Sequence, residues 1–250
     1  MKQAQEIFID NKSEVGVLLL HSFTSSPGEF GELADFLAER DFSVFVPIIA
    51  GHGSCPEDLR KTCPQDWTLS VLLAYQKLKQ VSKKIVVVGN SFGGNLAFWL
   101  AKETNNDLAG VVSLSAPLFL RFYRFIRFRY WLYGRFKRYY KKPPWAYKKG
   151  EARAIKETSY SVIPIKTLKE FWDFLKNETM PNLPAVKVPV LISYAVHDFI
   201  SLPATADFFY KKISSPDKEI YWVNDRCHVL TNSRRKSELF EKIYDFIKKI

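Results

Sequence analysis

The stretch Ile85–Phe98, IVVVGNSFGGNLAF, decides how the rest of this chain is arranged. Four β-branched residues lead into Gly89-Asn90-Ser91-Phe92-Gly93, and helix-forming residues follow at once. A buried strand, a tight turn and a helix with G-x-S-x-G at the turn form the setting of a nucleophilic serine. The serine backbone is strained in such a turn, so the residues two positions away must be small. The pattern predicts that Ser91 Oγ is exposed at the carboxyl end of a strand, above a helix N-terminus.

Short apolar runs alternate with helical stretches along most of the chain. The predicted strands are 7–9, 15–20, 42–46, 85–88, 108–114, 188–195 and 219–223, and the predicted helices are 27–40, 66–80, 203–213 and 233–250. Ser26 is a candidate N-cap for the first helix, with Pro27 at its first position. This alternation is typical of the α/β class and predicts a mostly parallel central sheet with helices on both faces.

Residues that can carry chemistry follow the predicted strands. They are His21, the loop Gly51-His52-Gly53, Ser91, Asp198 and His228. The carboxyl ends of parallel strands meet at one edge of a sheet, and reactive groups of this fold class gather there. We therefore expect these side chains to lie near one another.

A serine hydroxyl needs a base to take its proton, and the base needs an orienting acid. His228, between the last strand and the last helix, is the predicted base, while His21 and His52 are the alternatives, better suited to shaping the site wall. Asp198, after the penultimate strand, is the predicted acid. Asp225 is its rival, although its position three residues before His228 makes a facing geometry awkward.

Composition limits the class of protein. Cys55, Cys63 and Cys227 are odd in number and lack paired metal-ligand spacing, which favours a reducing compartment and no disulfide framework. The N-terminal residues lack a signal-peptide core, and no apolar run approaches the length of about 20 residues that a membrane span needs. A cytoplasmic protein, at most peripheral to a membrane, is expected.

The chain resembles the α/β-hydrolase family, and within it the small bacterial carboxylesterases and monoacylglycerol lipases. The resemblance covers nearly the full length and rests on the segments VGVLLLHSFTSSPGEF, PIIAGHGSCPEDL, VVVGNSFGGNLAF, SLSAPLF, HDFISLP and CHVLT. It implies an α/β-hydrolase core of residues 1–116 and 185–250 with an inserted cap, residues 117–184. It also implies hydrolysis of short-to-medium acyl esters or monoacylglycerols without a metal or organic cofactor.

The resemblance further assigns an oxyanion hole to two backbone N–H groups, those of Phe23 and Phe92. The family usually has His-Gly before the first of these positions, whereas this chain has His21-Ser22. A serine fits there only if the backbone does not need a positive φ. Two alternatives remain open: a thioesterase or amidase using the same three residues, and a non-catalytic lipid- or nucleic-acid-binding protein on a hydrolase scaffold.

The basic charge is concentrated in the predicted insertion. The formal net charge is +11, and 11 Lys or Arg without any Asp or Glu lie between Arg121 and Lys149. A helical projection gathers one apolar side, Phe122, Phe125, Ile126, Leu132, Tyr133 and Phe136, and one basic side, Arg121, Arg124, Arg127, Arg135 and Arg138. One interpretation is a cap that packs its aromatics over the site. The second is contact with an anionic membrane surface through Arg121, Arg124, Arg127, Phe122 and Phe125. Nucleic-acid binding is disfavoured, because no recognition module accompanies the basic run.

Overall fold

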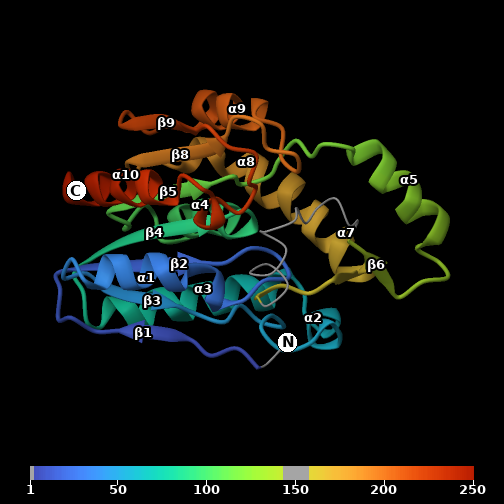
Figure 1. Cartoon of the computed structure of the whole chain (residues 1–250), viewed down its shortest axis with the longest axis horizontal. Helices are drawn as coiled ribbons and strands as arrows, with labels where there is room; N and C mark the ends of the chain where they lie inside the picture. The colour runs from blue at the N-terminus through green and yellow to red at the C-terminus, as the bar shows by residue number, and fades with distance from the viewer. Residues whose placement is uncertain (1–2, 143–157) are drawn as a thin grey trace.

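A computed structural model of the chain describes residues 3–142 and 158–250 (Figure 1). The last part of the basic run, residues 143–149, lies outside them. The central sheet has the strand order β1-β3-β2-β4-β5-β8-β9; only β1 is antiparallel to its neighbour. The strands are β1 (Ile7–Ile9), β2 (Val15–Leu20), β3 (Ser43–Val46), β4 (Lys84–Asn90), β5 (Gly110–Leu114), β8 (Val190–Ala195) and β9 (Lys218–Val223). The mostly parallel sheet predicted from the sequence is confirmed.

The continuous apolar runs of the strands feed two cores, one on each face of the sheet. Successive side chains of a strand point to opposite faces. In β4, Ile85 and Val87 therefore join one apolar cluster, and Val86 and Val88 join the other. Helices α3 (Pro64–Lys79), α4 (Phe92–Glu103) and α9 (Ala204–Lys212) contribute to the first cluster, and α1 (Gly31–Ala38) and α10 (Lys236–Lys248) to the second.

The strand order changes direction beside β2. The chain runs outward from β2 to β3 and then returns to the other side of β2 to form β4. The loops that follow β2 and β4 consequently diverge at this switch point, where α/β sheets bind their ligands. The loop that begins at His21 and the turn at Ser91 are thus brought side by side.

The predicted insertion lies between β5 and β8. It contains α5 (Tyr123–Tyr133), the antiparallel pair β6 (Tyr139–Lys141) and β7 (Val162–Pro164), and α7 (Ile165–Phe174). A π-helical turn (Leu175–Thr179), the short α8 (Met180–Asn182) and a 3₁₀ turn (Leu183–Ala185) complete it. Helix α7 packs Phe171 and Phe174 into the core, whereas α5 projects from the body of the molecule (Figure 1). The domain boundaries at residues 117 and 184 stay a prediction.

Two local features differ from what the sequence indicated. Ser26 does not cap a helix with its hydroxyl; its carbonyl accepts the Glu29 N–H at 3.0 Å, because the first turn, Pro27–Phe30, is a 3₁₀ turn. Helix α2 (Pro56–Lys61) was not predicted, although Pro56 at its start and acidic residues in its first turn were readable signals. In the basic segment, α5 ends before Gly134, a residue that weakens helices.

The apolar side predicted for α5 is confirmed only in part, because Ile126 packs against the core whereas other residues of that side are exposed. The helix packs through Ile126 and Tyr130, and the Tyr130 ring lies 5.4 Å from the Trp172 ring of α7. Phe122 and Phe125, from the predicted apolar side, have exposed fractions of 54% and 56%, and Phe128 and Trp131 are exposed at 56% and 71%. In the described residues, no helix combines the length and apolar character needed to cross a bilayer.

Candidate active site

Ser91 lies on a strained turn between β4 and α4. Its backbone has φ 51° and ψ −118°, outside the regions that L-residues favour. A methyl group on Gly89 would overlap the Gly93 backbone, and one on Gly93 would overlap the carbonyl oxygen of Leu20. The Ser91 N–H donates to the Leu114 carbonyl at 2.7 Å, which ties the turn to β5. The two glycines are therefore required by close backbone approach.

Hydrogen bonds join Ser91, His228 and Asp198 into one chain. His228 Nε2 lies 2.9 Å from Ser91 Oγ, and His228 Nδ1 lies 2.8 Å from Asp198 Oδ2. Asp198 is fully buried, and its Oδ1 accepts the N–H groups of Ile200 and Ser201 at 2.7 and 3.0 Å. The carboxylate on Nδ1 favours the tautomer with the proton there, which leaves Nε2 to accept the serine proton.

Asp225 is held in a different set of contacts. Its Oδ2 accepts from Ser233 Oγ at 2.6 Å and from the Arg234 N–H at 3.1 Å, and its Oδ1 accepts from the Arg226 N–H at 2.6 Å. These bonds brace the loop before His228. The structure therefore places Asp198, not Asp225, against the imidazole.

Among the histidines of the described residues, only His228 is hydrogen-bonded to Ser91, and two of the others shape the loops around it. His21 Nε2 accepts the Ile49 N–H at 3.3 Å, so its Nδ1 carries the proton and donates to the Ser22 carbonyl at 3.0 Å. Burial lowers the pKa of His21 to about 3 and that of His52 to about 4. Both rings are therefore neutral at ordinary pH. His197 is exposed.

The two predicted oxyanion donors lie on either side of the switch point. Phe92 is the first residue of α4, where a backbone N–H has no acceptor within the helix. The Ser22 carbonyl accepts from His21 Nδ1 and from the Ser25 N–H, both at 3.0 Å. Because N–H and C=O point in opposite directions across a trans peptide, these bonds also fix the direction of the Phe23 N–H.

The serine that replaces the usual glycine is accommodated without backbone strain. Ser22 is not among the residues with positive φ, whereas Thr24, two positions later, has φ 65°. The left-handed turn of this loop therefore falls on a residue other than Ser22, as the sequence required.

Comparisons with known proteins identify the family of the chain. The family described as "Serine aminopeptidase, S33" (Hydrolase_4) matches residues 11–235. The chain belongs to this family. This hydrolase is 31% identical to a thermostable monoacylglycerol lipase of Bacillus sp. (strain H-257), over 98% of the chain and 94% of the relative. It is 28% identical to a carboxylesterase of Bacillus subtilis (strain 168), over 94% and 92%.

Solved structures confirm the fold of the hydrolase. A structure from a study of LipS and LipT, two metagenome-derived lipolytic enzymes, superposes with a TM-score of 0.90 and 26% identity, covering 100% of this chain and 99% of the other. A monoacylglycerol lipase from Paleococcus ferrophilus superposes with a TM-score of 0.80 at 17% identity, covering 97% of each chain. The predicted α/β-hydrolase fold is thereby confirmed.

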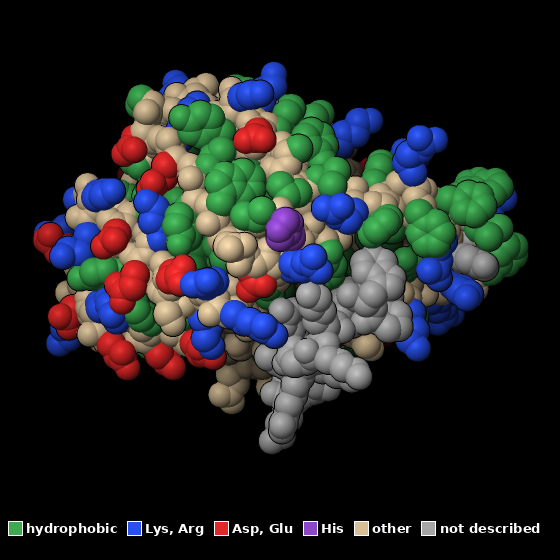
Figure 2. Space-filling model, turned by 45° about the horizontal axis from the view of Figure 1, so that its top comes forward, with side chains coloured by type: hydrophobic (Ala, Val, Ile, Leu, Met, Phe, Trp, Pro, Cys, Tyr) green, Lys and Arg blue, Asp and Glu red, His purple; other side chains and the backbone are tan. Residues whose placement is uncertain are grey.

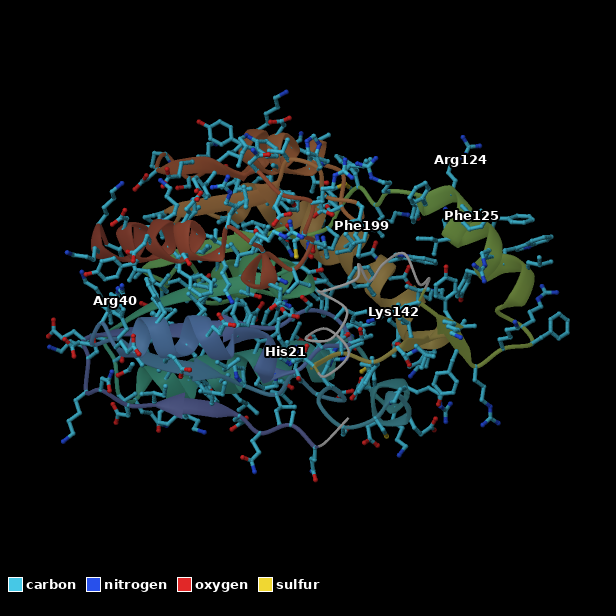
Figure 3. All side chains as sticks on the ribbon, in the orientation of Figure 1. His21, Arg40, Arg124, Phe125, Lys142 and Phe199 are labelled. Atoms are coloured by element: carbon cyan, nitrogen blue, oxygen red, sulfur yellow. The ribbon has the colours of Figure 1, made fainter. Side chains whose placement is uncertain are left out.

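A cavity of about 250 Å³ lies above Ser91 and His228 in the hydrolase. Its apolar lining includes Leu120, Phe122, Phe125, Ile126, Phe171 and Trp172, from the insertion. Figure 3 shows His21, Lys142 and Phe199 at the end of the sheet that faces the insertion, and Arg40 at the far end. The apolar walls suit a hydrocarbon chain next to the reactive serine.

The sequence grouped Arg121 with the solvated arginines, but the structure places it at the cavity. Its guanidinium donates to the Asp198 carbonyl at 3.0 Å, and the side chain lines the cavity. Arg124, by contrast, points away from the body of the hydrolase (Figure 3). Arg121 therefore supports the loop that carries Asp198. We no longer include it among the residues predicted to contact a membrane.

Lys142 is a further residue of the cavity that sequence reasoning missed. Its Nζ donates to Thr24 Oγ1 at 2.5 Å and to Ser159 Oγ at 2.8 Å, and burial lowers its pKa to about 7. In the sequence it is one more cation in a basic run, so only the fold distinguishes it. Within the described ranges, no three His, Cys, Asp or Glu side chains gather closely enough to hold a metal ion.

Proposed function

We propose that the chain hydrolyses carboxylic esters, with monoacylglycerols and short-to-medium acyl esters as its substrate class. The observation that carries the proposal is the unbroken hydrogen-bonded chain from Ser91 through His228 to Asp198 beneath an apolar cavity. The two curated relatives, a monoacylglycerol lipase and a carboxylesterase, support the same substrate class.

The proposed reaction is acyl transfer through Ser91. Ser91 Oγ attacks the ester carbonyl carbon while His228 Nε2 takes its proton, and the Asp198 carboxylate stabilises the imidazolium. The Phe23 and Phe92 N–H groups hold the oxyanion, each contributing about 3 kcal/mol. His228 then protonates the departing alcohol. Water, deprotonated by the same histidine, attacks the acyl-enzyme, and the acid is released with Ser91 restored.

An ester hydrolase should react with substrates and with a fluorophosphonate probe at one serine. We expect hydrolysis of p-nitrophenyl esters and of monoacylglycerols, and fluorophosphonate labelling that peptide mass spectrometry places on Ser91. Thioester and aminoacyl-anilide substrates form the comparison arms, because the family's description names an aminopeptidase. Faster turnover of anilides than of every ester would overturn the ester assignment, and an unlabelled Ser91 would overturn serine catalysis.

We also propose that the outer side of α5 contacts an anionic lipid surface. Exposed aromatic residues and arginines alternate there, including Phe128, Trp131, Arg124 and Arg127. Figure 2 shows apolar and basic side chains gathered at this end of the molecule, away from the acidic side chains on the surface of the α/β-hydrolase core. Such rings enter the headgroup layer while the cations meet anionic lipid, and the mouth of the cavity would then face lipid-held esters.

Replacing Arg124 and Arg127 by Gln should weaken binding to anionic vesicles about 30-fold, since each cation near the surface contributes about 1 kcal/mol. Hydrolysis of a soluble ester should change little. Cosedimentation with phosphatidylserine-containing and with neutral vesicles measures binding, which should fall with added salt. The matched control replaces Lys211 and Lys212, exposed cations of α9, by Gln. An equal loss in the control, or no binding of the wild type at low salt, contradicts the contact.

A further inference from the structure

Glu29 is a buried carboxyl group behind the two predicted oxyanion donors. It lies in the turn Pro27–Phe30, with an exposed fraction of 7%. Its Oε1 accepts three hydrogen bonds: from the Ser22 N–H at 3.1 Å, from Ser22 Oγ at 2.8 Å and from Asn90 Nδ2 at 3.1 Å. One oxygen therefore binds both Ser22, in the loop after β2, and Asn90, the last residue of β4.

The partners of Glu29 are the neighbours of the reactive groups. Ser22 precedes Phe23, and Asn90 precedes Ser91 and Phe92. Asn90 Nδ2 also donates to Ser22 Oγ at 2.8 Å, which closes a triangle of side-chain hydrogen bonds. A glycine in place of Ser22, the usual residue of the family, would supply the N–H but no hydroxyl. The triangle therefore requires the hydroxyl of Ser22.

We propose that Glu29 is a positioning residue for acyl transfer, which fixes the separation of the Phe23 and Phe92 N–H groups through Ser22 and Asn90. The proposal rests on the proposed function, because it concerns the oxyanion of that reaction. Oxyanion donors stabilise a transition state only when they are held at hydrogen-bond distance from the place where the charge develops. The loop after β2 and the turn after β4 extend from different strands. The hydrogen bonds from Ser22 and Asn90 to Glu29 link them and limit their relative movement.

The electrostatics of the bridge are compatible with this role. Burial raises the pKa of Glu29, against hydrogen bonds from Ser25, Ser22 and Asn90 that lower it. A raised pKa reduces the negative charge behind a site where an oxyanion must form. Oε1 accepts the same three hydrogen bonds whether or not the other oxygen carries a proton.

The test compares Glu29→Ala with Glu29→Gln on a soluble p-nitrophenyl ester. Alanine removes the shared acceptor, and we expect kcat to fall about 10²-fold with little change in KM, the effect of a displacement of about 1 Å at a reacting centre. Glutamine keeps an acceptor oxygen at the Oε1 position and should restore kcat to within about 3-fold of the wild type. Glu32→Ala, an exposed change in α1, is the matched control.

Two further measurements separate positioning from folding. Rates are expressed per active site titrated with the fluorophosphonate probe, so that unfolded molecules do not count. The affinity for a trifluoromethyl ketone, whose adduct with Ser91 carries an oxyanion, should fall in parallel with kcat/KM in Glu29→Ala. Asn90→Ala should show the same loss, and the double variant should lose much less than the product of the two effects, because both residues act through one bridge.

The proposal fails if kcat per titrated site in Glu29→Ala stays near the wild-type value, or if Glu29→Gln is as slow as Glu29→Ala. Failure of the proposed function is recognised separately, since the wild type itself would then neither hydrolyse esters nor label at Ser91.

Discussion

Alanine in place of Ser91 is expected to lower kcat about 10⁶-fold, and adding His228→Ala to this variant should cost almost nothing further. The reason is that the two side chains act as one unit, joined by the 2.9 Å hydrogen bond. Removing the nucleophile leaves His228 with no proton to take. The measurement is kcat for a p-nitrophenyl ester, with each variant purified separately so that traces of wild type do not set the lower limit.

Two asparagine variants, one in the loop after β8 and one in the loop after β9, test which carboxylate orients His228. Asp198→Asn should lower kcat about 10⁴-fold, because an amide no longer favours the imidazole tautomer that leaves Nε2 free. Asp225→Asn makes the same chemical change at a residue bound to Ser233 and Arg234, and it should affect stability more than kcat. A larger loss of kcat in Asp225→Asn would reverse the assignment of the acid.

Alanine in place of Gly93 is expected to lower the free energy of unfolding by about 3 kcal/mol, or Tm by about 6–12 °C. The added methyl group overlaps the Leu20 carbonyl, which is backbone and cannot rotate away. The turn must shift, and kcat/KM should fall about 10²-fold or more as Ser91 moves relative to His228.

Gly31→Ala is the control for this substitution. A methyl group there meets no atom within 4 Å, and the backbone is helical at φ −48°. Thermal melting and ester hydrolysis of the two variants are compared. We expect Gly31→Ala to raise the free energy of unfolding by no more than about 1 kcal/mol, because alanine favours the helical backbone more than glycine does. Equal effects at the two positions would show that the close approach at Gly93 is not what requires glycine.

The sheet and the residues at its carboxyl edge could be predicted because local pattern and fold class constrain each other. The apolar run before Ser91 has the length of a buried strand, and parallel strands place Ser91, Asp198 and His228 at one edge. The choice of Asp198 over Asp225 followed from the same reasoning, since a carboxylate after a neighbouring strand can face the histidine from across the loop.

The bridge of Glu29 could not be predicted in this way. Glu29 and Asn90 are 61 residues apart, and their contact depends on the directions of two polar side chains within buried loops. Sequence periodicity reports which face of an element is apolar, but it carries no information on such directions. The only available signal was the serine at position 22, which lacks a role unless its hydroxyl has partners.

The buried side of α5 was predicted only in part, for a related reason. Aromatic residues occur all around this helix, so the hydrophobic period cannot choose a buried side. The buried side is instead determined by the surface against which the helix packs, where the Tyr130 ring contacts the Trp172 ring. A sequence rich in both arginine and aromatic residues therefore predicts an amphipathic surface, but not which residues face the protein.

The site has no partial form during synthesis of the chain. Ser91 and His228 are 137 residues apart in sequence, and His228 follows β9, an edge strand of the sheet. Contacts between such distant segments form slowly and after local helices, because closing a long loop costs chain entropy. A nascent chain that ends after α4 lacks both the β5 carbonyl that holds the Ser91 turn and the base that activates the hydroxyl. Hydrolytic chemistry begins only when the last parallel strand has been added, which couples the onset of activity to the end of folding.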